Sequence, residues 1–317
     1  MKKVAKILKW FLSVVGLLLM LIVLLFGHRD KTVEELSPRY AEVPSAFVEI
    51  DGMAVHFRDE GDPRDSLPLV LIHGTSSSLH TFDTWVQLIK PYKRVVRMDL
   101  PGFGLTGPFP DRNYHIDHYI DFLEKFLKAR DIEHCILGGN SLGGYIAWEF
   151  ALAKPEIPDK LILIDAAGYP QRSASVPVGF ALARTPVFNK LLTYITPRFL
   201  VRSSVENVYA DKSKVSDTLV DRYFDLTLRA GNRQALVDRM KSGFDTLKVA
   251  QIKNIQAPTL VLWGAQDLLI PVDVAYRFHE DLPHDTLVIL DQNGHVPMEE
   301  SPEESVKAVL RFIGKQP

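Results

Sequence analysis

The five residues from Gly139 to Gly143 (Gly-Asn-Ser-Leu-Gly) have a spacing that can make a serine reactive. They follow the apolar run Cys135–Leu137 and precede an apolar stretch with helical character that starts at Tyr145. A G-x-S-x-G pattern between a strand and a helix is typical of a sharp turn that holds the serine hydroxyl above the edge of a sheet. Glycines are needed there because side chains would collide with the neighbouring strand or helix. We therefore expect Ser141 to be a nucleophile.

A serine hydroxyl is a weak nucleophile at neutral pH and needs an adjacent base. His295 is the best candidate, because it lies on the loop after the last apolar run of the chain, where Gly294 should let the backbone turn. Asp267 follows the preceding apolar run by one short turn and is the candidate that orients the histidine. Asp165, at the end of another apolar run, is the alternative acid.

Two backbone N–H groups should hold the negative oxygen that forms in such a reaction. One is the N–H of Leu142, directly after the serine. The other is expected from the loop after the apolar run 69–72, with Thr75 preferred and Ser76 as the alternative. The hydroxyls of Thr75–Ser78 could instead cap the helix that follows.

The remaining histidines are not assigned to the reaction. Those in helical or polar loop stretches are expected to be solvated: His80, His115, His118, His279 and His284. Three more have no carboxylate or nucleophile in their sequence context: His28, His56 and His134. No two histidines have H-x-H or H-x-x-x-H spacing, so we expect no metal and no cofactor.

The elements that must position these residues alternate between strands and helices. Expected strands are a hairpin of 47–50 with 55–57, the segment 95–98, and the apolar runs 69–72, 136–137, 161–164, 260–263 and 287–290. The clearest helical periodicity covers 115–128. This alternation predicts a mostly parallel sheet covered by helices on both faces.

One long segment interrupts the alternation and predicts an insertion. Residues 169–245 contain helical patterns but no convincing buried strand. A structureless loop of that length is uncommon, so we expect a helical cap over the carboxyl edge of the sheet. The core would then consist of residues 46–168 and 246–317.

The first 27 residues predict a membrane segment. Four lysines precede an uncharged apolar run from Trp10 to Gly27, which is near the lower length limit for crossing a bilayer. No small-x-small cleavage site follows, so we expect a retained signal anchor at 1–27, with a cleaved signal peptide as the alternative. The lysines predict a cytoplasmic N-terminus and a catalytic domain on the periplasmic or other extracytoplasmic side. Residues 28–45, with Pro38 and Pro44, are expected to form a juxtamembrane linker.

Composition narrows the class of protein. The chain has 317 residues, of which 46% are hydrophobic and 24% charged, as in a globular protein with a sizeable core. A net charge of −2 provides no electrostatic basis for binding nucleic acid. The single cysteine, Cys135, excludes an intrachain disulfide and is expected to be a core thiol.

Taken together, these motifs resemble those of the α/β-hydrolase superfamily. In chain order they are His73-Gly74, Asp99–Gly104, Gly139–Gly143, Trp263–Asp267 and Gly294-His295, and the resemblance extends from about residue 45 to 314. It implies an α/β-hydrolase fold with a helical cap, and it implies that the histidine at 73 is structural while its loop shapes the oxyanion hole. The order Ser, Asp, His along the chain also matches this family.

The expected activity is that of a serine hydrolase acting on a carboxylic ester through an acyl-enzyme, with a small lipophilic acyl ester as substrate. One alternative is a carbon–carbon bond hydrolase of ring-cleavage products, because Asn140 before Ser141 resembles the motif of that group. Val296 after His295, and the absence of glycines in the loop after His73, depart from that group. The other alternative is a non-catalytic binding module tethered to the membrane, whose expected signature is an incomplete triad.

Overall fold

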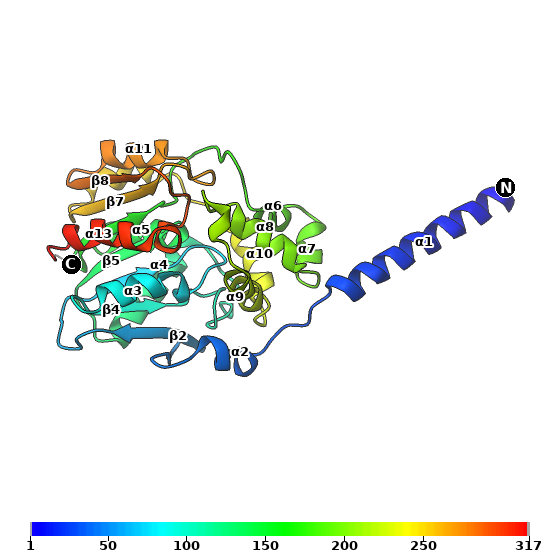
Figure 1. Cartoon of the computed structure of the whole chain (residues 1–317), viewed down its shortest axis with the longest axis horizontal. Helices are drawn as coiled ribbons and strands as arrows, with labels where there is room; N and C mark the ends of the chain where they lie inside the picture. Colours follow the sequence, from blue (N-terminus) through cyan, green and yellow to red (C-terminus); the bar gives the residue numbers. More distant parts are fainter. Residues whose placement is uncertain (1, 316–317) are drawn as a thin grey trace.

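The computed structural model describes residues 2–315, which build an eight-stranded sheet with the order β1-β2-β4-β3-β5-β6-β7-β8 (Figure 1). β1 and β2 form an antiparallel hairpin, β2 pairs antiparallel with β4, and the pairs from β4 to β8 are parallel. The predicted hairpin and the mostly parallel sheet are therefore confirmed. The strands are β1 Ala46–Ile50, β2 Met53–Glu60, β3 Leu69–Ile72, β4 Val95–Met98, β5 Cys135–Asn140, β6 Pro158–Ile164, β7 Thr259–Gly264 and β8 Asp285–Leu290.

Helices cover both faces of the sheet, as predicted. One face packs against α3 (Asp83–Ile89) and α13 (Pro302–Phe312), the other against α4 (Ile116–Ala129), α5 (Leu142–Ala153) and α11 (Asp273–Asp281). Central strands β3 and β4 are buried at every position. β3 is accordingly a continuous apolar run, whereas β4 contains Arg97, whose guanidinium pairs with Glu60 and Asp83. Shorter helical segments are η1 Leu79–Phe82, η3 Val249–Asn254 and α12 Pro297–Glu300.

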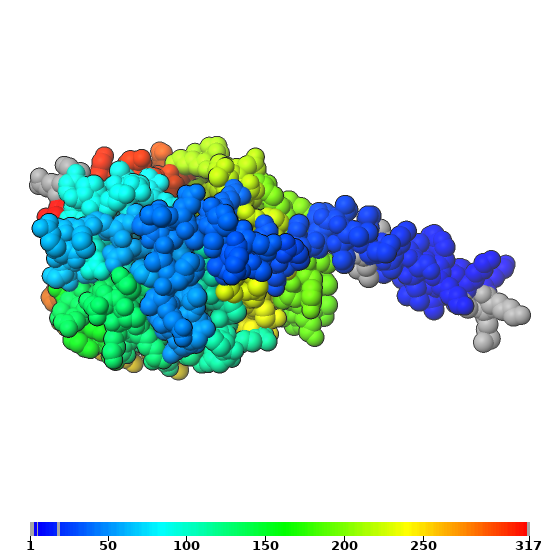
Figure 2. Space-filling view, turned by 90° about the horizontal axis from the view of Figure 1, so that it is seen from below, coloured from blue at the N-terminus to red at the C-terminus, as the bar shows by residue number. Residues whose placement is uncertain are grey.

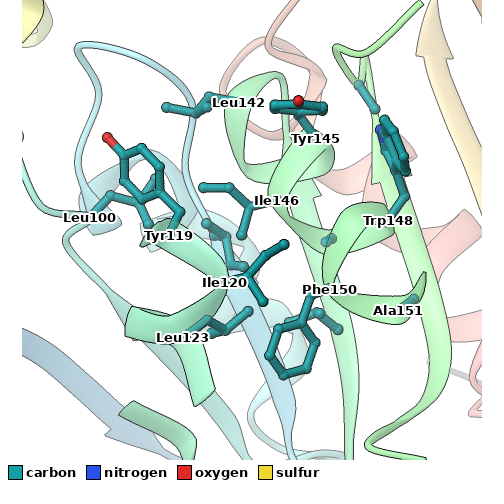
Figure 3. Close-up of a cluster of buried hydrophobic side chains, with 14 of the residues drawn as sticks. Leu100, Tyr119, Ile120, Leu123, Leu142, Tyr145, Ile146, Trp148, Phe150 and Ala151 are labelled. Atoms are coloured by element: carbon teal, nitrogen blue, oxygen red, sulfur yellow. The ribbon is translucent and has the colours of Figure 1, made fainter. Parts of the chain in front are cut away.

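The core beneath α5 fixes the turn from which that helix starts. Figure 3 shows Ile120 and Leu123 of α4 beside Ile146 and Phe150 of α5. These side chains are almost completely buried and belong to one apolar cluster. Cys135 lies in the same cluster, where burial raises the pKa of its thiol to about 12, and the prediction of a core thiol is confirmed.

The cap consists of short helices between β6 and β7. They are α6 Val178–Arg184, α7 Phe188–Leu192, α8 Arg198–Glu206, η2 Lys212–Lys214, α9 Asp217–Thr227 and α10 Asn232–Ser242. In Figure 1 they lie together at one end of the molecule, beyond the carboxyl ends of the strands. In the described part of the chain no strand lies in this segment.

The N-terminal helix α1 (Lys2–Phe26) projects from the end of the body that the cap forms, as Figures 1 and 2 show. It is long and apolar enough to cross a membrane. The expected linker contains a helix that the sequence analysis did not foresee, α2 (Val33–Tyr40), with Pro38 inside it. A capping box between Thr32 and Glu35 starts this helix, and burial of Leu36 and Tyr40 holds it against the cap and core.

Candidate active site

Ser141 lies in the sharp turn between β5 and α5. Its φ of 55° and ψ of −111° are strained for a residue with a side chain. The turn is close-packed, because a Cβ on Gly139 would collide with the carbonyl of Gly143, and a Cβ on Gly143 with the carbonyl of Ile72 in β3. The N–H of Ser141 donates to the carbonyl of Ile164 in β6 at 3.0 Å. Its side chain is thus presented at the carboxyl edge of the central strands.

His295 and Asp267 meet at this edge. Nδ1 of His295 lies 2.6 Å from Oδ2 of Asp267, and both residues are buried. The other carboxylate oxygen accepts hydrogen bonds from the N–H groups of Leu269 (2.8 Å) and Ile270 (3.0 Å), which fix its orientation. With Nδ1–H donating to the carboxylate, Nε2 is the ring nitrogen that can accept a proton.

Two residues that sequence reasoning did not assign hold the histidine loop. Asn140 donates from Nδ2 to the carbonyl of His295 at 2.9 Å. Glu300 is buried and accepts from the N–H of Gly294 (2.8 Å) and from that of Asp211 in the cap (2.7 Å). The position of Asn140 beside the nucleophile was a usable signal, whereas no local pattern marks Glu300.

Gly294 is required for a different reason from the one expected. Its φ is not positive, so a special turn does not explain it. A Cβ at Gly294 would lie only 2.6 Å from the carbonyl oxygen of Val208 and 2.7 Å from the N of Ala210. The neighbouring N–H of His295 donates to the same Val208 carbonyl at 2.8 Å. The glycine therefore lets the cap approach the histidine loop.

Asp165, the alternative acid, lies beside Asp267. Its Oδ1 accepts from the N–H of Gly264 at 2.9 Å. Burial, and then the negative charge of Asp267, raise the pKa of Asp165 well above its usual range. These surroundings favour the protonated form of Asp165, and it is Asp267 whose carboxylate faces Nδ1 of His295.

The two expected oxyanion donors are the residue after Ser141 and a residue of the loop after β3. The N–H of Leu142 is at the first turn of α5, and Thr75 lines the same cavity as the serine. Among the described residues neither N–H has a hydrogen-bond acceptor. Gly74 allows this approach, because a Cβ there would lie 3.2 Å from Cβ of Ser141. Ser76, the alternative donor, has a φ of 62°.

The hydroxyls after Thr75 do not cap the following helix, contrary to one expectation. Ser78 precedes η1 but makes no side-chain cap, and its Oγ bonds to Nδ1 of His80 at 3.1 Å. The first N–H of η1, from Leu79, donates to Oδ1 of Asp99 at 2.7 Å. A buried carboxylate is the stronger acceptor, so it replaces the hydroxyl.

A cavity of about 130 Å³ lies between the sheet edge and the cap. Ser141, His295 and Thr75 line it on the sheet side. The cap side is mainly apolar, with Phe180, Leu192, Leu200, Val201, Val205 and Leu236. Arg233 also lines it, but this guanidinium lies 2.6 Å from Asp30 and donates to the carbonyl of His28 at 2.9 Å. The space therefore suits an apolar group more than an anion.

Three predictions about the other histidines are wrong. His80 is buried, and burial lowers its pKa to about 4. His56 is fully buried with Nδ1 at 2.7 Å from Oδ2 of Asp99, and the exposed His134 lies 3.2 Å from Asp159. The partners come from strands distant in sequence, which local context does not reveal. His73 is buried and accepts from the N–H of Leu100 at 2.9 Å, as a structural histidine would.

His56 belongs to a second Ser–His–Asp arrangement. Its Nε2 lies 2.8 Å from Oγ of Ser45, whose oxygen also accepts from Nε of Arg58 at 2.9 Å. Burial alone would raise the pKa of Asp99, but the charge and hydrogen bond of His56 hold it well below its usual range. None of these four side chains lines the cavity. This arrangement ties β2 to the end of β4.

One group of side chains has a geometry that a metal could use. Asp165, Asp267 and His295 each offer an atom within 4.8 Å of the others. Nδ1 of His295, however, is the atom that bonds to Asp267, and Oδ1 of Asp165 accepts from the N–H of Gly264. The direct hydrogen bond in this group is the one between His295 and Asp267, which suits an acid–base pair.

Comparison with known proteins places this geometry in context. The model of the "Alpha/beta hydrolase family" matches residues 69–308. The "Uncharacterized hydrolase YugF" of Bacillus subtilis is 28% identical over 83% of this chain and 96% of its own. The 2-hydroxy-6-oxo-6-(2'-aminophenyl)hexa-2,4-dienoic acid hydrolase of Metapseudomonas resinovorans is 26% identical over 92% of this chain and 97% of its own.

Among solved structures, one described as a membrane phospholipase A and bacterial virulence factor superposes with a TM-score of 0.71. It is 24% identical, and the match covers 99% of this chain and 98% of that one. At this identity the likeness concerns the fold, and its coverage extends through the N-terminal helix.

Proposed function

Since the chain belongs to the alpha/beta hydrolase family, we propose that it is a serine hydrolase of carboxylic esters, with Ser141, His295 and Asp267 as its triad. One observation carries the proposal. Ser141, with its strained backbone, and His295 line one mainly apolar cavity, and Nδ1 of His295 lies 2.6 Å from the buried carboxylate of Asp267. This arrangement is suited to acyl transfer.

In the proposed first step, Oγ of Ser141 attacks the ester carbonyl carbon and its proton moves to Nε2 of His295. The carbonyl oxygen becomes an oxyanion, which the N–H groups of Leu142 and Thr75 stabilise. Asp267 stabilises the imidazolium. His295 then gives the proton to the leaving alcohol, the carbon–oxygen bond breaks, and the acyl group stays on Ser141.

In the second step a water molecule gives its proton to His295 and attacks the acyl carbonyl. A second oxyanion forms against the same two N–H groups. When it collapses, the bond to Ser141 breaks, the serine recovers its proton from His295, and the carboxylic acid leaves. No cofactor or metal takes part in this scheme.

The substrate is proposed to be a lipophilic acyl ester. The cap side of the cavity is mainly apolar, and hydrocarbon is favoured in such a space by about 0.8 kcal/mol for each buried CH₂. A series of 4-nitrophenyl esters from C2 to C12 tests this. We expect kcat/KM to rise with chain length to an optimum, and a steady decline from C2 would contradict the proposal.

Carbon–carbon bond hydrolysis is the second candidate, because the M. resinovorans relative is named for such an activity and Asn140 resembles that group. Dienoate products of ring cleavage carry a carboxylate, however, and the guanidinium of Arg233 at the cavity is already paired with Asp30. Parallel assays with a 2-hydroxy-6-oxo-dienoate and with esters separate the two. Faster turnover of the dienoate would favour carbon–carbon hydrolysis.

A non-catalytic, membrane-tethered binding module is the third candidate function, and a fluorophosphonate probe tests it. Such probes react only with an activated serine, so we expect label on the peptide that contains Ser141. Absence of label in folded protein would favour the binding module.

We propose that α1 is retained as a single membrane span, with a cytoplasmic N-terminus and an extracytoplasmic catalytic domain. Carbonate washing should leave the chain in the membrane fraction, because it does not remove a spanning helix. Protease added on the extracytoplasmic side should digest the catalytic domain. Recovery of a mature chain that starts beyond residue 27 would show a cleaved signal instead.

The linker after α1 is packed more tightly than its sequence predicts, which affects where the chain can be shortened. Asp30 pairs with the buried Arg233, Lys31 lies 2.7 Å from Asp225, and Tyr40 bonds to the same carboxylate at 2.8 Å. A chain that starts near Val43 keeps every proposed catalytic residue but loses all three contacts. We expect it to be less stable than one that starts at His28.

A further inference from the structure

Five large apolar side chains on the outside of the cap are exposed to solvent. They are Val187, Phe188, Leu191, Tyr194 and Phe199, with exposed fractions between 44% and 72%. We call them the cap patch. Single exposed apolar side chains are common, but a cluster on one short segment marks a contact surface.

The cap patch adjoins the end of α1. The ring of Phe26, the last residue of α1, packs edge-on against Phe199 with centroids 5.7 Å apart. The chain after α1 pairs with the cap at Gly27 and Ile195, and the N–H of His28 donates to the carbonyl of Tyr194 at 3.2 Å. If α1 spans a bilayer, the membrane surface therefore lies beside the cap patch (Figures 1 and 2).

The charges of this part of the cap suit an anionic surface. From Ala166 to Val205 the sequence has five Arg or Lys residues and no Asp or Glu. Two of the five, Arg198 and Arg202, pair with carboxylates in the segment 206–221, so the other cations carry the argument. Arg184 and Lys190, next to the cap patch, are exposed and make no ion pair with any described residue. Apolar side chains with cationic neighbours are typical of segments that bind anionic lipid at the interface.

The cap patch and the cavity share the same helices. In α7, Leu191 is exposed whereas Leu192 lines the cavity, and in α8, Phe199 is exposed whereas Leu200 and Val201 line it. One layer of side chains thus separates the proposed active site from the outside of the cap at this point. An acyl chain has a short apolar route between the two.

We propose that the cap patch is embedded in the surface of a bilayer containing anionic phospholipid. Acyl esters of membrane lipids then enter the cavity past the side chains of α7 and α8. This inference rests on the proposed retained span and on the proposed esterase activity. It gives the anchor a role in substrate capture, because α1 holds one particular face of the cap at the membrane.

A fluorescence experiment on the full chain tests the contact. Phe188→Cys and, as the control, Tyr276→Cys on α11 have similar exposure in the native chain, 51% and 49%. Each is labelled with nitrobenzoxadiazole at the introduced cysteine, because Cys135 is buried, and is then reconstituted into phosphatidylethanolamine–phosphatidylglycerol vesicles. We expect lipid-attached quenchers to quench the label at 188 and not the label at 276. Equal quenching at the two positions would overturn the proposal.

A second copy of the chain, instead of the bilayer, could cover the cap patch. Lowering the ratio of protein to lipid distinguishes these two contacts. Quenching of the label at 188 should be unchanged when the ratio of protein to lipid is lowered. A label that is shielded from the quenchers, and becomes exposed to water as the protein is diluted, would show a protein contact and overturn the proposal.

Activity separates this inference from the two proposals on which it rests. Phe188→Asp with Leu191→Asp should lower hydrolysis of a lipid ester in vesicles by about tenfold or more, since two apolar side chains leave the bilayer. Hydrolysis of a soluble short-chain ester should match that of the Tyr276→Asp control. Unchanged hydrolysis of the lipid ester would overturn the inference. A wild-type chain inactive on every ester would contradict the esterase, and extraction by carbonate would contradict the span.

Discussion

The proposed triad of Ser141, His295 and Asp267 can be compared with the buried set of Ser45, His56 and Asp99, because the surroundings of the two serines differ. Ser141 has strained backbone geometry, lies at the start of a helix and lines a cavity. Ser45 lies away from that cavity, and Arg58 donates a hydrogen bond to its oxygen. His56 lies at hydrogen-bonding distance from both Ser45 and Asp99, yet this alone does not make an active site. Access, a free lone pair and donors for an oxyanion are also required.

Replacing each serine by alanine should give the largest difference between the two sets of residues. Ser141→Ala should lower ester hydrolysis by roughly 10⁴-fold or more, because the nucleophile is lost. Ser45→Ala should leave kcat/KM within about twofold, because that oxygen only connects His56 and Arg58. Steady-state kinetics with a soluble ester measure both. Circular dichroism must show that each variant is folded. A severe loss of kcat/KM in folded Ser45→Ala would show that Ser45 takes part in catalysis.

Removing the charge of the proposed catalytic acid should have the next largest effect. Asp267→Asn removes the carboxylate that faces His295 Nδ1 and allows the wrong histidine tautomer. We expect kcat to fall roughly 10³- to 10⁴-fold with a nearly unchanged thermal midpoint. Asp165→Asn is the matched control. If it were the more damaging of the two, the assignment of the acid would be wrong.

The equivalent change in the second arrangement should affect stability instead. The carboxylate of Asp99 is fully buried, lies 2.7 Å from His56, and accepts from the N–H groups of Leu79 and Leu105 at 2.7 and 2.8 Å. Asp99→Asn should lower the free energy of unfolding by about 3–5 kcal/mol, the usual cost of breaking a buried ionic contact. Thermal unfolding measures this. A variant as stable as wild type would show that the buried arrangement is not structural.

The two arrangements also show what a sequence can and cannot reveal. β3 was predictable because a strand buried on both faces is a continuous apolar run, and the turn at Ser141 was predictable because its glycines have a fixed spacing. The partners of His56 were not, since Asp99 is 43 residues away and neither residue belongs to a periodic pattern. The helix around Pro38 was missed because tertiary packing outweighs a local helix breaker.

The smallest effect is expected at Asp165, whose buried carboxyl group has a raised pKa beside Asp267. Burial and the charge of Asp267 raise its pKa in the folded protein, whereas in the unfolded chain an aspartate titrates near about 3.9. Below that pH the group is protonated in both states and has no effect on the pH dependence of folding. As pH rises toward the folded pKa, only the unfolded chain releases the proton, so the folded state loses stability.

Asp165→Asn abolishes this titration, while its amide oxygen can still accept from the N–H of Gly264. The variant should therefore match wild type in thermal midpoint near pH 4 and exceed it near pH 7.5, with kcat/KM retained within about tenfold. Asp165→Ala leaves the Gly264 N–H without its acceptor and should lower the free energy of unfolding by about 1–3 kcal/mol. Thermal unfolding at the two pH values distinguishes these outcomes. If Asp165→Asn were less stable at pH 7.5 than at pH 4 relative to wild type, the carboxyl group would be ionised in the folded protein.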